Sequence, residues 1–132
     1  MPLNLAIVDP ATLEAASNAL HDAPFDVKDI RYDPTAQTFE MILSREVQGR
    51  LVPTRFRHVY REVEAPKVRS TQCRLTFRHV EKADIAIDAP RGNELIGLEY
   101  DSASRTVSFD TGGAVKIALR VTELDAEVAD IA

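Results

Sequence analysis

The sequence has no tryptophan, one cysteine and five glycines among 132 residues. A single cysteine, Cys73, excludes a disulfide within the chain and favours a reducing compartment. No apolar run approaches the ~20 residues that a membrane-spanning helix requires, and the first residues lack the basic and apolar regions of a secretory signal. We therefore expect a cytoplasmic protein with no membrane partner.

Several catalytic and cofactor motifs are also missing. The sequence contains no glycine-rich phosphate loop, no His-Glu-x-x-His, no Cys-x-x-Cys and no Gly-x-Ser-x-Gly. Cys73 and the three histidines do not have the spacing of paired metal ligands. The sequence therefore predicts no metal, no cofactor and no catalytic residue, and it favours a protein that is not an enzyme.

The charge distribution is uneven although the net charge is only −5. Residues 45 to 82 carry ten Lys or Arg against four Asp or Glu, a net +6, whereas residues 1 to 44 and 83 to 132 carry −5 and −6. Within this basic segment the sequence Phe-Arg-His-Val occurs twice, at 56 to 59 and at 77 to 80. Apolar and cationic residues alternate here, as in strands with one buried face.

The order of the expected elements indicates the fold class. A short strand from Leu3 to Ile7 precedes a helix from Pro10 to about His21, with Asp9 as its N-cap. Strand patterns follow, including two long strands at 54 to 63 and 68 to 80. The sequence predicts an α+β fold with a single domain over residues 1–132. Its sheet is mostly antiparallel and strongly curved, with about eight or nine strands and the N-terminal helix packed on it. Residues 122 to 132 suit a short C-terminal helix or an edge strand, and their Ala, Glu and Asp content favours the helix.

Two segments 68 residues apart share a hairpin pattern. Residues 30 to 41 align without gaps on residues 98 to 109, and in both a strand ends in Tyr-Asp and a threonine starts the return strand. The aspartates, Asp33 and Asp101, are expected to accept hydrogen bonds from the backbone of the turn. Convergence on favourable turn chemistry is preferred here to duplication of half-domains.

The chain resembles a family of small bacterial proteins, the domain of unknown function 2948 family. The likeness rests on residues 5 to 9 leading into the helix, on the segment from Cys73 to Val80, and on Gly112 to Leu119. The resemblance implies a compact α+β domain without an established activity.

Two function classes are compatible with the basic segment. The first is a non-enzymatic binding or assembly module, in which the strand surface of residues 55–82 meets an acidic protein surface or a second copy of the chain. The second is an enzyme or small-anion sensor that uses His58, His79 and neighbouring arginines around a phosphate or carboxylate. Nucleic acid is a less favoured partner, because glutamates interrupt the basic segment. We favour the binding module, with these candidate partner-binding residues: Arg55, Arg57, Arg61, Arg74, Arg78, His58 and His79.

Overall fold

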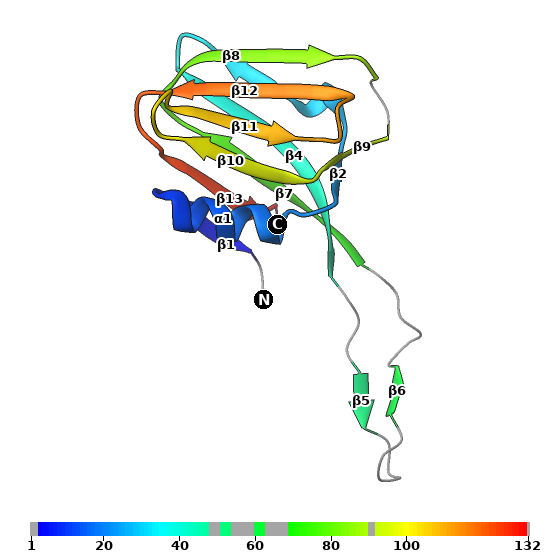
Figure 1. Ribbon diagram of the computed structural model, residues 1–132. Helices are drawn as coiled ribbons and strands as arrows, with labels where there is room; N and C mark the ends of the chain where they lie inside the picture. Colours follow the sequence, from blue (N-terminus) through cyan, green and yellow to red (C-terminus); the bar gives the residue numbers. More distant parts are fainter. Residues whose placement is uncertain (1–2, 48–50, 54–59, 63–68, 90–91, 132) are drawn as a thin grey trace.

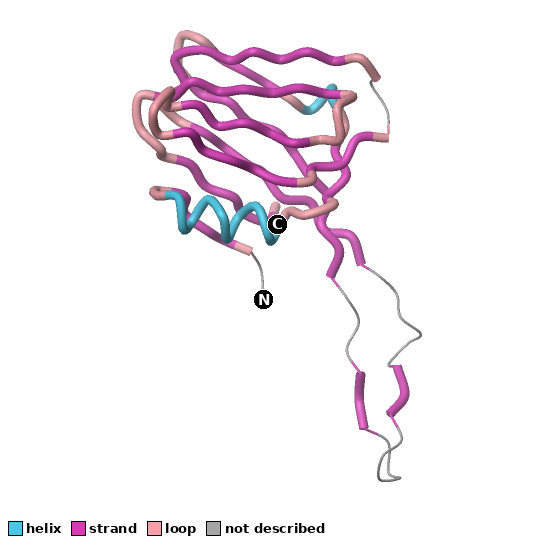
Figure 2. Tube along the Cα trace, viewed as in Figure 1, coloured by secondary structure: helices cyan, strands magenta, loops and turns pink. Residues whose placement is uncertain are grey.

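The computed structural model describes residues 3–47, 51–53, 60–62, 69–89 and 92–131. Within these residues the chain forms one α-helix, α1 (Pro10–Ala19), one 3-10 turn, η1 (Val27–Asp29), and the strands shown in Figures 1 and 2. The strands are β1 (Asn4–Ile7), β2 (Ala23–Phe25), β3 (Arg31–Asp33), β4 (Thr38–Val47), β5 (Leu51–Pro53), β6 (Tyr60–Glu62), β7 (Arg69–Phe77), β8 (Val80–Ile87), β9 (Asn93–Leu95), β10 (Gly97–Asp101), β11 (Thr106–Asp110), β12 (Val115–Val121) and β13 (Ala126–Asp130).

The described strands pair in an antiparallel sense and form two main sheets. The first has seven strands in the order β1-β13-β7-β4-β2-β9, with β3 also paired to β4. The second has four strands in the order β10-β11-β12-β8, and β5 pairs with β6 as a separate ladder. The mostly antiparallel sheet structure and the N-terminal helix are as expected from the sequence. The difference is that the strands divide between two main sheets instead of forming one.

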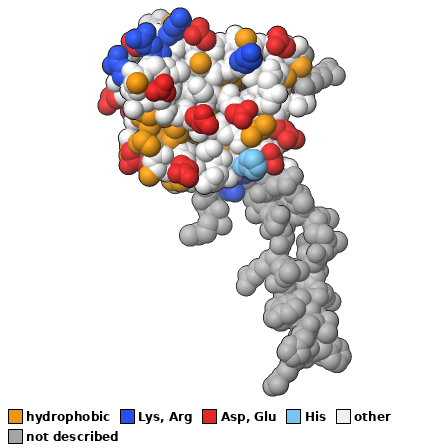
Figure 3. All heavy atoms as spheres, viewed as in Figure 1, with side chains coloured by type: hydrophobic (Ala, Val, Ile, Leu, Met, Phe, Trp, Pro, Cys, Tyr) orange, Lys and Arg blue, Asp and Glu red, His pale blue; other side chains and the backbone are white. Residues whose placement is uncertain are grey.

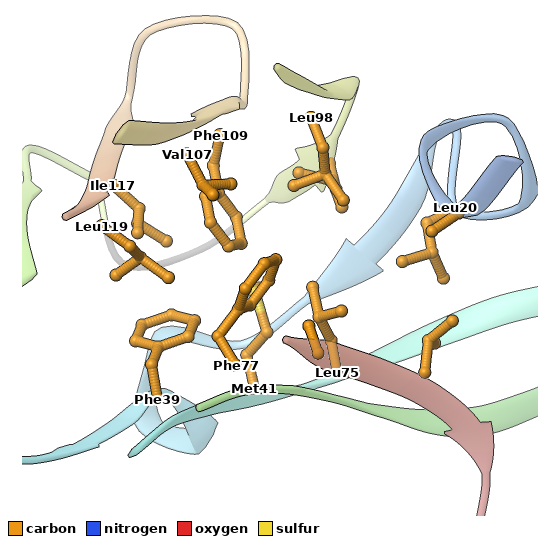
Figure 4. Packing of buried hydrophobic residues seen from close by; sticks show 14 of the residues in the cluster. Leu20, Phe39, Met41, Leu75, Phe77, Leu98, Val107, Phe109, Ile117 and Leu119 are labelled. Carbon is orange, nitrogen blue, oxygen red and sulfur yellow. The ribbon is translucent and has the colours of Figure 1, made fainter. Parts of the chain in front are cut away.

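The core lies between the two sheets (Figure 4). Phe39 of β4 and Phe77 of β7 are fully buried and face the second sheet, where the ring of Phe109 meets both of them. The ring centroids of Phe39 and Phe109 lie 5.5 Å apart in an edge-to-face arrangement, and those of Phe77 and Phe109 lie 5.8 Å apart. Each sheet therefore buries the apolar side of its alternating pattern against the other.

Helix α1 covers the side of this core next to β1 and β10. Its start is fixed by Asp9, whose side chain accepts a hydrogen bond from the backbone nitrogen of Thr12 at 2.8 Å. Leu13, Ala16 and Leu20 are buried, as their helical spacing predicts. The helix is therefore held by one apolar face rather than by its own propensity.

The two Tyr-Asp hairpins have the same local structure. Asp33 accepts hydrogen bonds from two backbone nitrogens of its turn, and Asp101 accepts one from the nitrogen of Ala103 at 3.0 Å. The return strand begins after a residue with positive φ in both copies, Gln37 at 57° and Arg105 at 54°. The strand registers also correspond, because the aspartate pairs with a threonine in each ladder. The predicted hairpin geometry is confirmed.

The prediction of a helix in residues 122 to 132 is wrong. These residues contain strand β13, which pairs with β1 on one side and with β7 on the other. The segment is therefore not an edge strand either. The buried residues Ala126 and Val128 alternate with exposed Glu127, because successive side chains of a strand point to opposite faces and one face of this sheet covers the core.

Candidate functional site

The candidate site begins where the chain leaves the first sheet and enters the second. The sequence predicted one continuous strand from 68 to 80, but β7 ends at Phe77 and β8 begins at Val80. His79 has a φ of 56°, in the left-handed region that non-glycine residues rarely adopt. The backbone nitrogen of Arg78 donates to the oxygen of Asp125 at 2.9 Å, and the oxygen of His79 accepts from Thr122 at 3.0 Å. The β7–β8 corner is thus fastened to the segment between β12 and β13.

Arg78 forms ion pairs with this C-terminal acidic segment. One guanidinium nitrogen lies 2.9 Å from the Asp125 carboxylate and another lies 3.1 Å from that of Glu127. The hydrogen bond from Arg78 lowers the pKa of Asp125, and the hydrogen bond to Asp125 raises the pKa of the guanidinium. The positive charge of Arg78 is therefore matched within the chain, although its side chain stays 39% exposed.

His79 lies in the same group of charged side chains. Its Nε2 atom is 3.0 Å from a carboxylate oxygen of Glu123 and 3.3 Å from one of Asp125. The side chain of His79 is 43% exposed at this position. We name Arg78, His79, Glu123, Asp125 and Glu127 the junction cluster, because they join the two sheets at this corner.

Arg74 has different surroundings from Arg78, although both belong to the same basic segment. It is exposed on β7 between the buried residues Cys73 and Leu75, so it points from the outer face of the seven-stranded sheet. Its cross-strand neighbours are Ile42 and Ala129. Among the ion pairs formed by the described residues, none involves Arg74.

The predicted site residues therefore fall into three groups according to where they lie. Arg78 and His79 come together in the junction cluster, and Arg74 stands apart on the outer face. Arg55, Arg57 and His58 lie outside the described residues. Arg61 belongs to β6, but its side chain lies outside the described part. The binding surface predicted for residues 55–82 therefore stays a prediction.

A groove of about 300 Å³ on the outer face is a feature that the sequence did not indicate. Its lining residues come from β2, η1 and the strands β4 and β7: Pro24, Phe25, Asp26, Lys28, Asp29, Ile42, Ser44 and Gln72. Arg74 borders it, because Arg74 pairs with Ile42 and follows Gln72 by two residues on the same strand face. The groove is hard to anticipate because it joins residues from separate hairpins; the only local signal is Asp26, which caps η1.

A second missed interaction is an ion pair between β4 and β13. Arg45 donates to both carboxylate oxygens of Asp130, at 2.8 and 2.5 Å, and the nitrogen of Leu3 donates to the same carboxylate at 2.7 Å. The hydrogen bond from Arg45 lowers the pKa of Asp130 to about 2. The two side chains are only 18% and 12% exposed, so the pair is part of the structure rather than a binding surface.

The described residues give little support to a metal site, a membrane-spanning helix or a nucleophilic cysteine. No group of three or more His, Cys, Asp or Glu side chains in that part of the chain has the geometry to hold a metal ion. The described helix is neither long nor apolar enough to cross a bilayer. Nucleophilic chemistry at Cys73 is disfavoured, because burial raises the pKa of its thiol to about 11.

These observations define a class, a small α+β protein of antiparallel sheets with charged groups on its surface and at its sheet junction. The chain belongs to a family described as "Protein of unknown function (DUF2948)", whose model matches residues 3–132. The resemblance drawn from the sequence is thereby confirmed. No curated protein and no solved structure matches the chain.

Proposed function

We propose that this protein is a non-enzymatic binding module that recognises an acidic protein surface through arginines of its basic segment. The proposal takes residues 1–132 as one domain and places it in the cytoplasm, since one cysteine suits a reducing compartment. The observation that supports it is the contrast between Arg74 and Arg78. Arg78 is matched by Asp125 and Glu127, whereas Arg74 is exposed without an acidic partner among the described ion pairs.

The contrast narrows the set of binding residues. Arg78 and His79 belong to the junction cluster, where carboxylates of the same chain already occupy them. We therefore propose Arg74, together with Arg55, Arg57 and Arg61 of the preceding segment, as the residues that meet the partner. An exposed guanidinium attracts carboxylates through geometry and charge, and such surfaces act mainly on association rate and orientation.

The alternative, an enzyme or small-anion sensor using His58, His79 and arginines, has less support. It requires these groups to converge on a hollow that can enclose an anion. The lining of the groove described above contains neither Arg74 nor Arg78 nor His79. The carboxylates of Asp26 and Asp29 in that lining also disfavour an anion there.

Fluorescein-labelled polyglutamate is a suitable probe for the proposal, measured by fluorescence anisotropy over a series of salt concentrations. Wild-type protein should bind at low salt and lose affinity as salt screens the exposed charges. Arg74→Gln should weaken binding roughly two- to fivefold, the range for one exposed ion pair. The four-residue variant, with Arg55, Arg57 and Arg61 also changed to Gln, should lose most of it.

Lys116→Gln is the matched control, because Lys116 is an exposed strand residue of the other sheet. It lowers the net charge equally but should leave the affinity nearly unchanged. Equal weakening by Lys116→Gln, or polyglutamate binding by the four-residue variant at wild-type strength, would contradict the proposal. Binding of millimolar inorganic phosphate that depends on His79 would instead favour the anion sensor.

A further inference from the structure

We propose that two copies of this protein associate through the free edge of β8, which pairs antiparallel with the β8 of the partner about Ile85. This surface is distinct from the arginines above, so the inference does not rest on the proposed function. Strand β8 lies at the end of the four-stranded sheet, and among the described residues no strand pairs with its other side. A long edge strand with apolar side chains is a ready template for another strand.

The hydrogen-bond pattern shows which backbone groups are free. The nitrogen of Asp88 donates to the oxygen of Ala114 at 2.8 Å, so the backbone of Asp88 faces β12. In an antiparallel ladder the residues alternate between facing the partner and facing away. Since Lys82 to Ile87 pair in unbroken register with β12, the N–H and C=O groups of Ala83, Ile85 and Ile87 point to the free edge. These residues can therefore form hydrogen bonds with a second strand without breaking the existing sheet.

The first residue of β8 already forms hydrogen bonds within the chain, and these limit how far a partner strand can extend along the edge. The nitrogen of Val80 donates to the oxygen of Gln37 at 2.9 Å, and the hydroxyl of Tyr32 donates to the oxygen of Val80 at 3.0 Å. A register irregularity separates Val80 from the regular ladder. The open part of the edge thus runs from residue 82 to residue 88, and a partner strand over that window leaves both contacts in place.

Two large apolar side chains in this window are exposed. Ile85 is 37% exposed and Ile87 is 46% exposed, although both lie on the inner face of the sheet opposite buried Ile117 and Val115. They are exposed because the strand has no neighbour to complete the inner layer. A second strand carrying the same residues would extend that layer and cover them.

Two β8 strands related by a two-fold axis can pair in several registers, each centred on a residue that faces its own copy. The charges of the side chains favour one of these registers. When Ile85 faces Ile85 of the partner copy, Lys82 lies opposite Asp88 twice and Ala83 lies opposite Ile87. Registers centred on Lys82, Asp84 or Ala86 place lysine against lysine or aspartate against aspartate. The register centred on Ala83 also pairs opposite charges, Lys82 with Asp84, but it places Ile85 opposite Glu81 and leaves Ile87 outside the window. The Ile85 register is the one that matches both charge and apolar side chains.

The size of the contact indicates a weak, concentration-dependent dimer. Seven residues of one strand cover less surface than the ~1,200 to 2,000 Å² of a typical stable interface. We therefore expect sedimentation equilibrium to show a monomer at low micromolar concentration and a rising dimer fraction toward the millimolar range.

Single cysteines along β8 test the register directly. Under mild oxidation Ile85→Cys should give a disulfide-linked dimer, because residues facing each other in a hydrogen-bonded antiparallel pair have Cα atoms ~5.5 Å apart. Ala83→Cys, Asp84→Cys and Ala86→Cys should not exceed the level of Ser108→Cys, an exposed control within the same sheet. The native Cys73 does not compete, since it is fully buried. Preferential cross-linking at 83, 84 or 86 would overturn the proposed register.

Charge reversal tests the pairing without cysteine chemistry. Lys82→Asp should raise the dimer dissociation constant about tenfold, because two attractive pairs become repulsive. Adding Asp88→Lys should restore it, whereas adding Asp84→Lys should not. Circular dichroism melts of each variant establish that the fold is retained. A chain that stays monomeric to millimolar concentration, or a Lys82→Asp defect that Asp88→Lys fails to repair, would overturn the proposal.

Discussion

The ion pair between Arg45 and Asp130 is expected to stabilise the folded protein, and replacing Asp130 tests this. Asp130→Asn removes the negative charge but keeps an oxygen that can accept the hydrogen bond from Leu3. The guanidinium of Arg45, only 18% exposed, then loses its partner. A charge that is mostly removed from water and unpaired destabilises the folded state.

The size of the effect follows from the pKa of Asp130. That pKa falls from 3.8 to about 2, chiefly because of the hydrogen bond from Arg45, with a smaller effect of the hydrogen bond from Leu3. A carboxylate whose pKa is lower in the folded state stabilises the fold above its unfolded pKa, and this contribution is lost as pH falls through the folded value. A shift of this size contributes about 2 kcal/mol to the free energy of unfolding at pH 7, and roughly half of that contribution remains at pH 3.

Urea denaturation of the wild type and Asp130→Asn between pH 7 and pH 2 measures this contribution. We expect the free energy of unfolding of the variant to be about 2 kcal/mol lower than that of the wild type at pH 7. The two values should become equal as the pH approaches 2. Asp84→Asn is the control, because Asp84 is 68% exposed in a 3.8 Å pair with Lys82; its effect should stay within about 0.5 kcal/mol. A difference between wild type and Asp130→Asn that is small at pH 7, or constant down to pH 2, would refute the reasoning.

Two other predictions concern the core and the turns. Leu20→Ala should lower the free energy of unfolding by about 2 to 5 kcal/mol, since Leu20 is fully buried; a loss of only a few tenths in chemical denaturation would contradict its place in the core. Gln37→Gly and Arg105→Gly should each leave stability unchanged or raise it by up to about 1 kcal/mol, because glycine adopts positive φ without strain; a clear loss in thermal unfolding would show that the side chains matter more than the backbone.

Local patterns predicted the elements whose stabilising contacts are close in sequence. The capping of α1 by Asp9 and the turns at Asp33 and Asp101 each depend on atoms two or three residues apart. The sequence carries these signals directly, and the helix and both hairpins are confirmed. The positive φ at Gln37 and Arg105 was not anticipated, since neither residue type marks such a position as glycine or asparagine would.

Long-range contacts decided the features that the sequence did not predict. The helical spacing of Leu124, Val128 and Ile131 competes with the alternation of Ala126 and Val128, and only the gap between β1 and β7 selects a strand. No glycine or proline marks the break at His79. The neutralisation of Arg78 depends on Asp125, 47 residues further on, so alternation along β7 could not separate it from Arg74.

The position of β13 between β1 and β7 has a consequence for the order in which the chain folds during synthesis. Strand β1 is made before the other described strands, yet the strand that pairs with it in the described sheet is β13, and the contact between Leu3 and Asp130 spans 127 residues. Until β13 has been made, β1 has no strand neighbour, and closing so long a loop delays the pairing. Helix α1, which follows β1 at once and packs on it, is the element that can cover the apolar residues Leu5 and Ile7 during that interval. In the finished protein α1 packs on the sheet, and during synthesis it is the described element available to pack on the apolar residues of β1 before β13 has been made.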